Sequence, residues 1–260
     1  MSMQSIIDRP QRTLYHYTSL EALVSILGRE RILLWATNAS YLNDPTEISN
    51  GIEVINEIEK SDLKLEDFRN YYLTSFSDNP DSLVMWSKYG SKGGGCSIGF
   101  DYDCICRAYG QVCKCIYGKQ KASEHLRNSL NLIDNGVITS FGMPKLSEEE
   151  EASSKRASRE MILQATCLMV KNEAYSHENE TRGFVCVPPE SYKYVNFRLV
   201  NNYVSPYVQM ELSKNALRRI VIGPTLNADI TLNSIKKMLE IRGYELDGVE
   251  VINSKIPFRG

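Results

Sequence analysis

The stretch TLYHYTSLEALVSILG at residues 13–28 decides the fold class of this chain. Its first five residues, with Leu14, Tyr15 and Tyr17, predict a short strand. Thr18 and Glu21 have the spacing of a capping box, and the leucines and valine that follow recur on one helical face until Gly28 ends the pattern. Residues 32–36 are again rich in strand-forming side chains. This part of the chain therefore predicts a strand, a helix and a second strand.

Similar patterns continue along the rest of the chain. Further helices are predicted to start at Asp44-Pro45 and at Asn79-Pro80, and another passes through Leu232, Ile235 and Leu239. Further strands are predicted at residues 71–77, 96–101, 112–117, 183–187, 194–200, 217–222 and 249–252. Residues 119–175 are mostly helical and predict an elaboration packed on the sheet. With no repeat or linker in the chain, residues 1–260 are predicted to form a single α+β domain.

Composition and charge limit the classes of protein to which this chain can belong. Of the 260 residues, 42% are hydrophobic and 24% are charged, which is ordinary for a folded protein. Thirty basic against 32 acidic residues give a net charge of −2, so no overall basic field attracts the chain to nucleic acid or to anionic membranes. No apolar run reaches the roughly 18 residues of a membrane span. With an odd number of cysteines, seven, this composition predicts a cytoplasmic protein without membrane association.

Two segments near helix starts are candidates for ligand binding. His16 lies at the end of the first strand, just before a helix N-terminus, where ligands often bind. The alternative is a histidine that serves the core or a cap. Asn43, Asp44, Pro45 and Glu47 also match a stable helix start, with Asp44 as the N-cap and Glu47 at the third helical position. Asn43 is the member that capping explains least.

Aromatic and acidic residues supply a second set of candidates. Trp86 and Tyr89 share a short helix after the strand at 71–77, where a flat ring could stack on them; the alternative is that Trp86 belongs to the core. Glu178 and Glu180 precede the strand at 183–187, and strand alternation predicts them on one side. Such neighbouring carboxylates need a cation, which Arg182 or Lys171 could supply. The alternative is a solvated charged turn.

Two other motifs carry weaker predictions. The glycines 93–95 lack the ending and the context of a phosphate-binding loop and predict a turn, with a lid as the alternative. Cys104, Cys106, Cys113 and Cys115 could supply thiolates to zinc, but their Cys-x-Cys spacing is short for that metal. We therefore expect no metal site.

The ordered motifs resemble a known bacterial family. They are His16-Tyr17-Thr18, Asn43-Asp44-Pro45-Thr46-Glu47, Phe76-Ser77 with Met85-Trp86-Ser87-Lys88-Tyr89, Glu178-x-Glu180-x-Arg182, Gly223-Pro224 and the terminal residues 254–259. Together they resemble the domain-of-unknown-function 2971 family over nearly the whole chain. The name of that family states no activity.

A more distant resemblance, to ADP-ribosyltransferases, implies a function. The His-x-Thr of the first strand, a helix with a tyrosine, and a glutamate that opens a late strand resemble the His, Tyr, Glu pattern of those enzymes. The resemblance implies a split mixed or antiparallel sheet flanked by helices, with NAD bound as a substrate and no metal. It implies catalytic roles for Glu180, Glu178 and His16. It also implies ligand contacts for Thr18 and Tyr89. Further candidates for ligand contact in this chain are Tyr17, Asn43, Asp44, Trp86 and Arg182, of which Trp86 and the motif at residues 43–47 have no clear counterpart in those enzymes.

Three hypotheses follow. The first is an ADP-ribosyltransferase-like enzyme, a toxin or phage-defence effector that modifies an unknown protein or nucleic acid. The second is a nucleotide-binding or regulatory module without turnover. The third is an RNA 2′-phosphotransferase-like protein, which needs a basic cluster, for which the chain offers Arg182, Arg218 and Arg219. The sequence leaves open a homo-oligomer or an antitoxin partner.

Overall fold

A computed structural model describes residues 12–42, 44, 46–91, 94–135, 147–200, 202–225 and 227–257. It is an α+β structure with a mixed, mostly antiparallel sheet, as the sequence predicts. The chain divides into two compact units. We call residues 1–37, 72–112 and 177–260 the sheet unit and residues 38–71 and 113–176 the helical unit. The division leaves the prediction of one domain untested.

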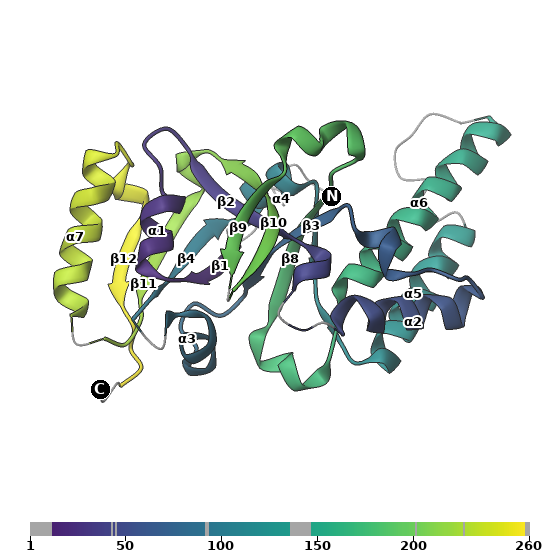
Figure 1. The fold of residues 1–260 in the computed structure, drawn as a ribbon, viewed down its shortest axis with the longest axis horizontal. Coiled ribbons are helices and arrows are strands. Elements are labelled where there is room, and N and C mark those ends of the chain that lie inside the picture. Colours follow the sequence, from purple (N-terminus) through teal and green to yellow (C-terminus); the bar gives the residue numbers. More distant parts are fainter. Residues whose placement is uncertain are drawn as a thin grey trace, which may run out of the picture. The chain divides into compact units, whose positions relative to one another are not determined.

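The sheet is built from strands that are far apart in the sequence (Figure 1). Within the described residues its order is β12-β11-β4-β1-β3-β2-β10-β9, and β8 pairs with β3. The pairing of β11 with β12 is parallel, whereas β1, β4 and β10 pair antiparallel with their neighbours. The strands are β1 (Thr13–Thr18), β2 (Ile32–Asn38), β3 (Tyr71–Ser77), β4 (Cys96–Asp101), β8 (Glu180–Cys186), β9 (Asn196–Val200), β10 (Tyr203–Leu212), β11 (Leu217–Ile222) and β12 (Glu250–Asn253).

Helices cover both faces of this sheet. One face buries the main core, to which α1 (Leu20–Ile26), α4 (Tyr102–Tyr109) and α7 (Ala228–Ile241) contribute apolar side chains. On the other face α3 (Leu83–Tyr89) packs Met85 and Trp86 against the tyrosines of β1. In Figure 1, α7 lies beside β12 and β11. Short 3₁₀ helices join strands at η6 (Pro189–Tyr194) and η7 (Lys214–Ala216), and η8 (Leu246–Gly248) joins α7 to β12.

The sheet opens between β1 and β3. Strand β1 pairs with β4 along its whole length, from Thr13 to Thr18. In the described structure it pairs with β3 at one position, Tyr15 with Ser77. Just past that pair the contact between the strands is made by a side chain, since Nδ1 of His16 lies 3.0 Å from the carbonyl oxygen of Ser75. The two strands therefore separate next to His16.

The helical unit contains α2 (Glu47–Glu59), α5 (Lys119–Asp134) and α6 (Glu148–Met169), which pack on one another. Gly51 allows α2 to approach α6 closely, because a Cβ there would lie 2.5 Å from the carbonyl oxygen of Cys167. The remaining elements of this part of the chain are short. They are η2 (Ala39–Tyr41), η3 (Leu65–Phe68), β5 (Gln111–Lys114), β6 (Ile116–Tyr117), β7 (Val170–Lys171) and η5 (Glu173–Glu178).

Several helix starts differ from the sequence expectations. The N-cap of α1 is Ser19, whose hydroxyl accepts a hydrogen bond from the backbone of Ala22, so the predicted Thr18 cap is wrong. Helix α2 begins at Glu47 after Thr46. Asp44 is not its cap, because its carboxylate accepts bonds from Thr46 in a turn that precedes the helix. Helix α3 begins at Leu83 rather than at Asn79-Pro80, since the intervening residues form turns.

Helix α4 and strand β10 are among the elements that were not predicted. Residues 102–109 form α4, so Cys104 and Cys106 lie on a helix and not on a strand. Strand β10 was missed because Pro206 lies in its middle; there it is opposite Phe197 of the neighbouring strand β9. The predicted strand at 112–117 is two short strands, β5 and β6.

Candidate functional site

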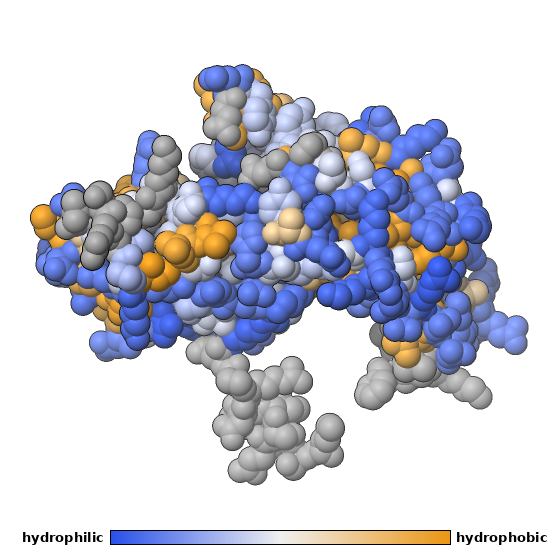
Figure 2. All heavy atoms as spheres, turned by 90° about the horizontal axis from the view of Figure 1, so that it is seen from below, coloured by the Kyte–Doolittle hydropathy of each residue, from blue (hydrophilic) through white to orange (hydrophobic). Residues whose placement is uncertain are grey.

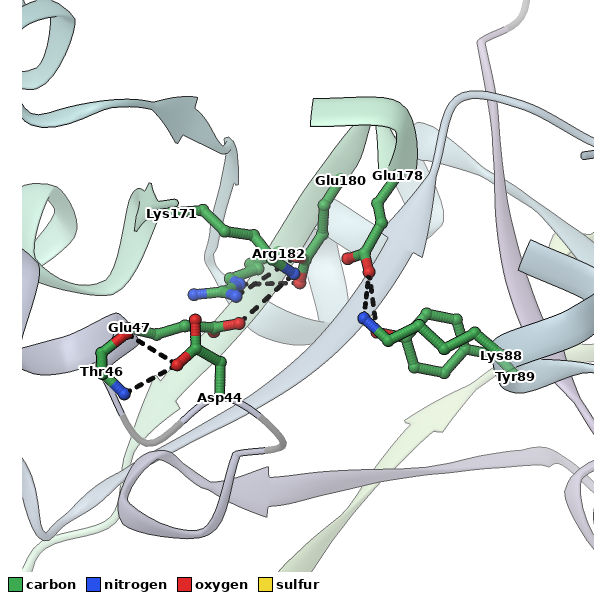
Figure 3. Close-up of polar contacts among 9 residues, drawn as sticks. All are labelled: Asp44, Thr46, Glu47, Lys88, Tyr89, Lys171, Glu178, Glu180 and Arg182. Atoms are coloured by element: carbon green, nitrogen blue, oxygen red, sulfur yellow. Dashed lines mark hydrogen bonds and ion pairs between the residues drawn. The ribbon is translucent and has the colours of Figure 1, made fainter. Parts of the chain in front are cut away.

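The side chains of Lys88 and Tyr89 converge on Glu178 (Figure 3). The Lys88 Nζ donates to Oε1 of Glu178 over 2.7 Å, and the Tyr89 hydroxyl donates to the same oxygen over 2.9 Å. Glu178 is 2% exposed, whereas the Lys88 side chain is about one-third exposed. Burial alone would lower the pKa of Lys88, but its hydrogen bonds with Glu178 and Tyr89 raise it overall. The result is an ion pair with a buried acid and an accessible cation.

A second acid lies two residues further on, in β8. Glu180 and Arg182 point to the same side of the strand, because side chains alternate along it. The guanidinium holds the carboxylate at two points, with Nε 2.7 Å from Oε1 and Nη2 3.2 Å from Oε2. Glu180 is 2% exposed and Arg182 is 1% exposed. Of the cations considered from the sequence, Arg182 is thus a partner of Glu180.

The two acids are not on one strand side. Glu178 ends the 3₁₀ helix η5, and Asn179 adopts a left-handed backbone with φ of 44° before β8 begins at Glu180. This turn is anchored to the end of β3, because the hydroxyl of Ser77 donates to the carbonyl of Glu178 and the backbone of Asp78 donates to Asn179. The predicted shared strand side is therefore wrong: the turn aims Glu178 at α3, while Glu180 follows the strand.

The residues of the first strand lie near its separation from β3. His16 is partly buried, and burial lowers its pKa below 6.5; the hydrogen bond with Ser75 opposes this shift and the charge of Arg198 adds to it. The Tyr17 hydroxyl donates to the carbonyl of Asn79 and accepts from the backbone of Ser82, and burial raises its pKa. Tyr17 therefore fixes the segment that leads into α3.

Sequence reasoning missed Asp81, which fastens α3. Its Oδ1 accepts from the indole nitrogen of Trp86 over 2.7 Å and from the hydroxyl of Ser254 over 2.6 Å. Its Oδ2 accepts from the backbone of Lys255. Trp86 is 1% exposed, which agrees with the core alternative for this residue. In the sequence, an aspartate five residues before a tryptophan is the pattern that could have indicated this hydrogen bond.

Thr18 lies where β4 begins, and Gly95 explains how the two segments meet. A Cβ at position 95 would lie 2.3 Å from the carbonyl oxygen of Thr18. Glycine is therefore required by a close backbone approach, not by phosphate binding. Gly93, another member of the glycine run, lies outside the described residues.

The remaining predicted residues belong to the helical unit. Asp44 makes the turn described above, and Asn43 and Pro45 lie outside the described residues. Glu47, at the first position of α2, forms an ion pair with Lys171 over 3.4 Å, and both side chains are about 5% exposed or less (Figure 3). Lys171 was considered as a cation for Glu178 or Glu180; its described partner is Glu47. That buried pair fixes the start of α2 against β7.

The basic residues considered for an RNA 2′-phosphotransferase are each paired with an acid. Arg218 and Arg219 line a hollow of about 480 Å³ in the sheet unit, with Tyr15 on its wall. There Arg218 pairs with Asp101 over 3.2 Å, and Arg219 pairs with Glu250 over 2.5 Å. Because neighbouring acids offset these charges, the hollow is not a basic cluster.

The described residues contain neither grouped metal ligands nor a membrane-spanning helix. No group of three or more histidine, cysteine, aspartate or glutamate side chains there could hold a metal ion. None of the helices in that part of the chain is long and apolar enough to cross a membrane. Figure 2 shows a largely hydrophilic surface with smaller hydrophobic groups on the face that it presents.

Comparisons with known proteins give limited matches. No curated protein matches the chain. The chain is similar to the solved structure "Thermus sp. 2.9 DarT in complex with ADP-ribosylated ssDNA", with a TM-score of 0.36 and 12% identity over 95% of this chain and 97% of that one. Residues 85–183 match the family model "Protein of unknown function (DUF2971)". This segment contains Trp86, Lys88 and Tyr89 of α3 as well as Glu178, Glu180 and Arg182. The predicted resemblance to the DUF2971 family is thus confirmed for the segment that contains both α3 and the two glutamates.

Proposed function

We propose that this chain is an ADP-ribosyltransferase-like enzyme. It would cleave the bond between nicotinamide and ribose in NAD and transfer ADP-ribose to a protein or nucleic acid. The observation that carries the proposal is the contact of Tyr89 with Glu178, since the resemblance to ADP-ribosyltransferases implies one site for these residues although 89 positions separate them. Beside it, β1 and β3 separate at His16. The described members of this constellation belong to the sheet unit.

The chemistry suits a buried acid next to an aromatic ring. Loss of nicotinamide builds positive charge on the ribose in an oxocarbenium-like transition state, as in glycoside hydrolysis. A carboxylate that contacts a ribose hydroxyl stabilises that charge more in the transition state than in the ground state. The ring of Tyr89 would hold the cationic nicotinamide by a cation–π contact, which contributes about 1 kcal/mol to binding.

We assign the ribose contact to Glu180 and a supporting role to Glu178. Arg182 bonds Oε1 of Glu180 at 2.7 Å and Oε2 at 3.2 Å, so its bond to Oε2 is the longer of these two. A ribose hydroxyl would compete with Arg182 for Oε2. Because Glu180 is almost fully buried, substrate must displace the groups that cover it. Thr18 of the sheet unit is a further proposed ligand contact, and the ligand contacts expected of Asn43 and Asp44 stay predictions.

One observation favours a second candidate function, a nucleotide-binding or regulatory module without turnover. A glutamate sealed against an arginine in a two-point ion pair is a common structural arrangement, and it needs no substrate. In that case Glu180 would stabilise β8, and the exposed Lys88 and the partly buried Tyr89 would bind ligand alone.

Incubation of the purified chain with NAD labelled on the adenylate, with and without cell extract, separates the two candidates. The proposed enzyme releases nicotinamide or labels a macromolecule, and Glu180→Gln lowers that rate on the order of 10²-fold. The matched control is Glu211→Gln, which removes an exposed acid paired with Arg31 in the same unit. NAD binding without product in wild type favours the module. Equal rates in wild type and Glu180→Gln, with both folded by circular dichroism, refute the role of Glu180.

A further inference from the structure

An arginine and two aromatic rings form a cluster on β2, β9 and β10. Trp35 and Tyr207 stack with their ring centroids 4.5 Å apart and their planes at 30°. The guanidinium of Arg198 lies over both rings, 5.3 Å from the centroid of Trp35 and 5.8 Å from that of Tyr207. Its Nη2 donates to the hydroxyl of Thr37 over 2.7 Å. Three side chains from two strands, Trp35 and Thr37 of β2 and Tyr207 of β10, therefore contact the guanidinium that β9 supplies.

The charge of Arg198 has no acid to offset it in the described part of the chain. No aspartate or glutamate described there lies within ion-pair distance of it, and its buried Nε has no hydrogen-bond partner. Burial lowers the pKa of this guanidinium from its usual value. By contrast, Arg31, Arg182 and Arg219 each pair with a carboxylate. A partly buried guanidinium held over rings in this way is suited to an anion from outside the chain.

The cluster acts on His16 of β1 and presents an exposed ring. The charge of Arg198 contributes to the lowered pKa of His16, so the guanidinium is within electrostatic reach of the imidazole. Trp35 keeps 37% of its surface exposed, and its neighbour Tyr207 is almost buried. An anion bound at Arg198 would therefore have an exposed indole beside it, on which a planar ring could stack.

We propose that Arg198, with Thr37 and Trp35, is a subsite for a phosphate group of a nucleotide. Planar guanidinium groups bind phosphate oxygens at two points, and the exposed indole favours a phosphate that carries a base over inorganic phosphate alone. Identifying that nucleotide as NAD rests on the proposed function. The subsite itself requires only a phosphate next to a flat ring.

A purely structural role for Arg198 predicts a different result. If the guanidinium only covers the stacked rings, its removal lowers stability and leaves nucleotide affinity unchanged. Arg198→Lys separates the two roles, because it keeps the charge but loses the planar fork. The subsite predicts an intermediate affinity for this variant.

Isothermal titration with ADP, adenosine and pyrophosphate tests the subsite in the full chain. We expect ADP to bind wild type more tightly than adenosine does, and Arg198→Gln to weaken ADP about 10- to 100-fold while adenosine is unchanged. The matched control is Arg31→Gln, which removes an exposed arginine that pairs with Glu211. Quenching of Trp35 fluorescence by ADP, absent in Trp35→Phe, places the ligand at the cluster.

The outcomes separate the subsite from the proposed function. Equal ADP affinity in wild type and Arg198→Gln overturns the subsite, as does equal binding of ADP and adenosine by wild type, or no binding of ADP and pyrophosphate. Arg198-dependent ADP binding without any NAD cleavage supports the subsite and contradicts the proposed enzyme. NAD cleavage that is unaffected by Arg198→Gln, with unchanged ADP affinity, retains the enzyme and removes the subsite.

Discussion

Replacing Arg182 by methionine tests how the buried acid is held. The variant keeps an unbranched side chain of similar length but leaves the carboxylate of Glu180, which is 2% exposed, without its two-point partner. Removing one member of a buried ion pair costs about 3–5 kcal/mol, because the other charge stays desolvated. At about 2–4 °C per kcal/mol for a chain of this size class, the melting temperature should fall by roughly 6–20 °C.

The double variant makes this prediction specific to the pair. Glu180→Gln alone strands the guanidinium and should cost a similar amount. In the double variant neither charge remains, so its loss should be smaller than the sum of the single losses by about 2 kcal/mol or more. Urea unfolding followed by circular dichroism gives all four free energies of the cycle.

The control cycle uses Arg31 and Glu211, an ion pair of the same unit whose side chains are about half exposed. Solvent screens that pair, so its variants should change stability far less. The reasoning about Arg182 is refuted if Arg182→Met loses no more stability than Arg31→Met, or if the two losses at Arg182 and Glu180 simply add.

Three further predictions concern the sheet unit. Because the pKa of His16 is lowered in the folded state, the unfolded state binds more protons, so stability should fall as the pH drops below about 6.5. Urea titrations at several pH values should show a flatter dependence in His16→Gln, and an unchanged dependence would contradict this role of His16. Asp81→Asn should cost about 1–3 kcal/mol and speed proteolysis of the C-terminal segment, and an unchanged digestion pattern would contradict its anchoring role. Gly183→Ala should cost about 1–3 kcal/mol in urea unfolding, because its Cβ would lie 2.7 Å from the ring of Tyr109; a neutral result would show that the ring can move.

The sequence predicted elements whose apolar pattern is strong. Helix α1 and strand β3 were placed correctly because their patterns match one period only. Helix α4 was missed although Asp101 caps it and Gly110, with φ of 73°, ends it, since its tyrosines and cysteines resemble a strand. Local sequence patterns thus predict a helix or strand most accurately where the residue types and the apolar period indicate the same structure.

The candidate site was predicted only in part, for a physical reason. The pairing of Glu180 with Arg182 can be predicted from the sequence, because side chains two residues apart on a strand lie on the same side. The direction of Glu178 does not, because it depends on the left-handed Asn179 and on a bond from Ser77, which is 101 residues away from Glu178. Asp81 was missed for the same reason, as its partner Ser254 is 173 residues away.

The most direct test of the central claim is a crystal structure of the chain with an unreactive NAD analogue bound. We expect the nicotinamide ring to lie against Tyr89 and a ribose hydroxyl to lie within hydrogen-bond distance of Glu180 or Glu178. We also expect a phosphate near Arg198. An analogue bound elsewhere, for example in the hollow lined by Arg219, with the Glu180–Arg182 pair undisturbed, would contradict it.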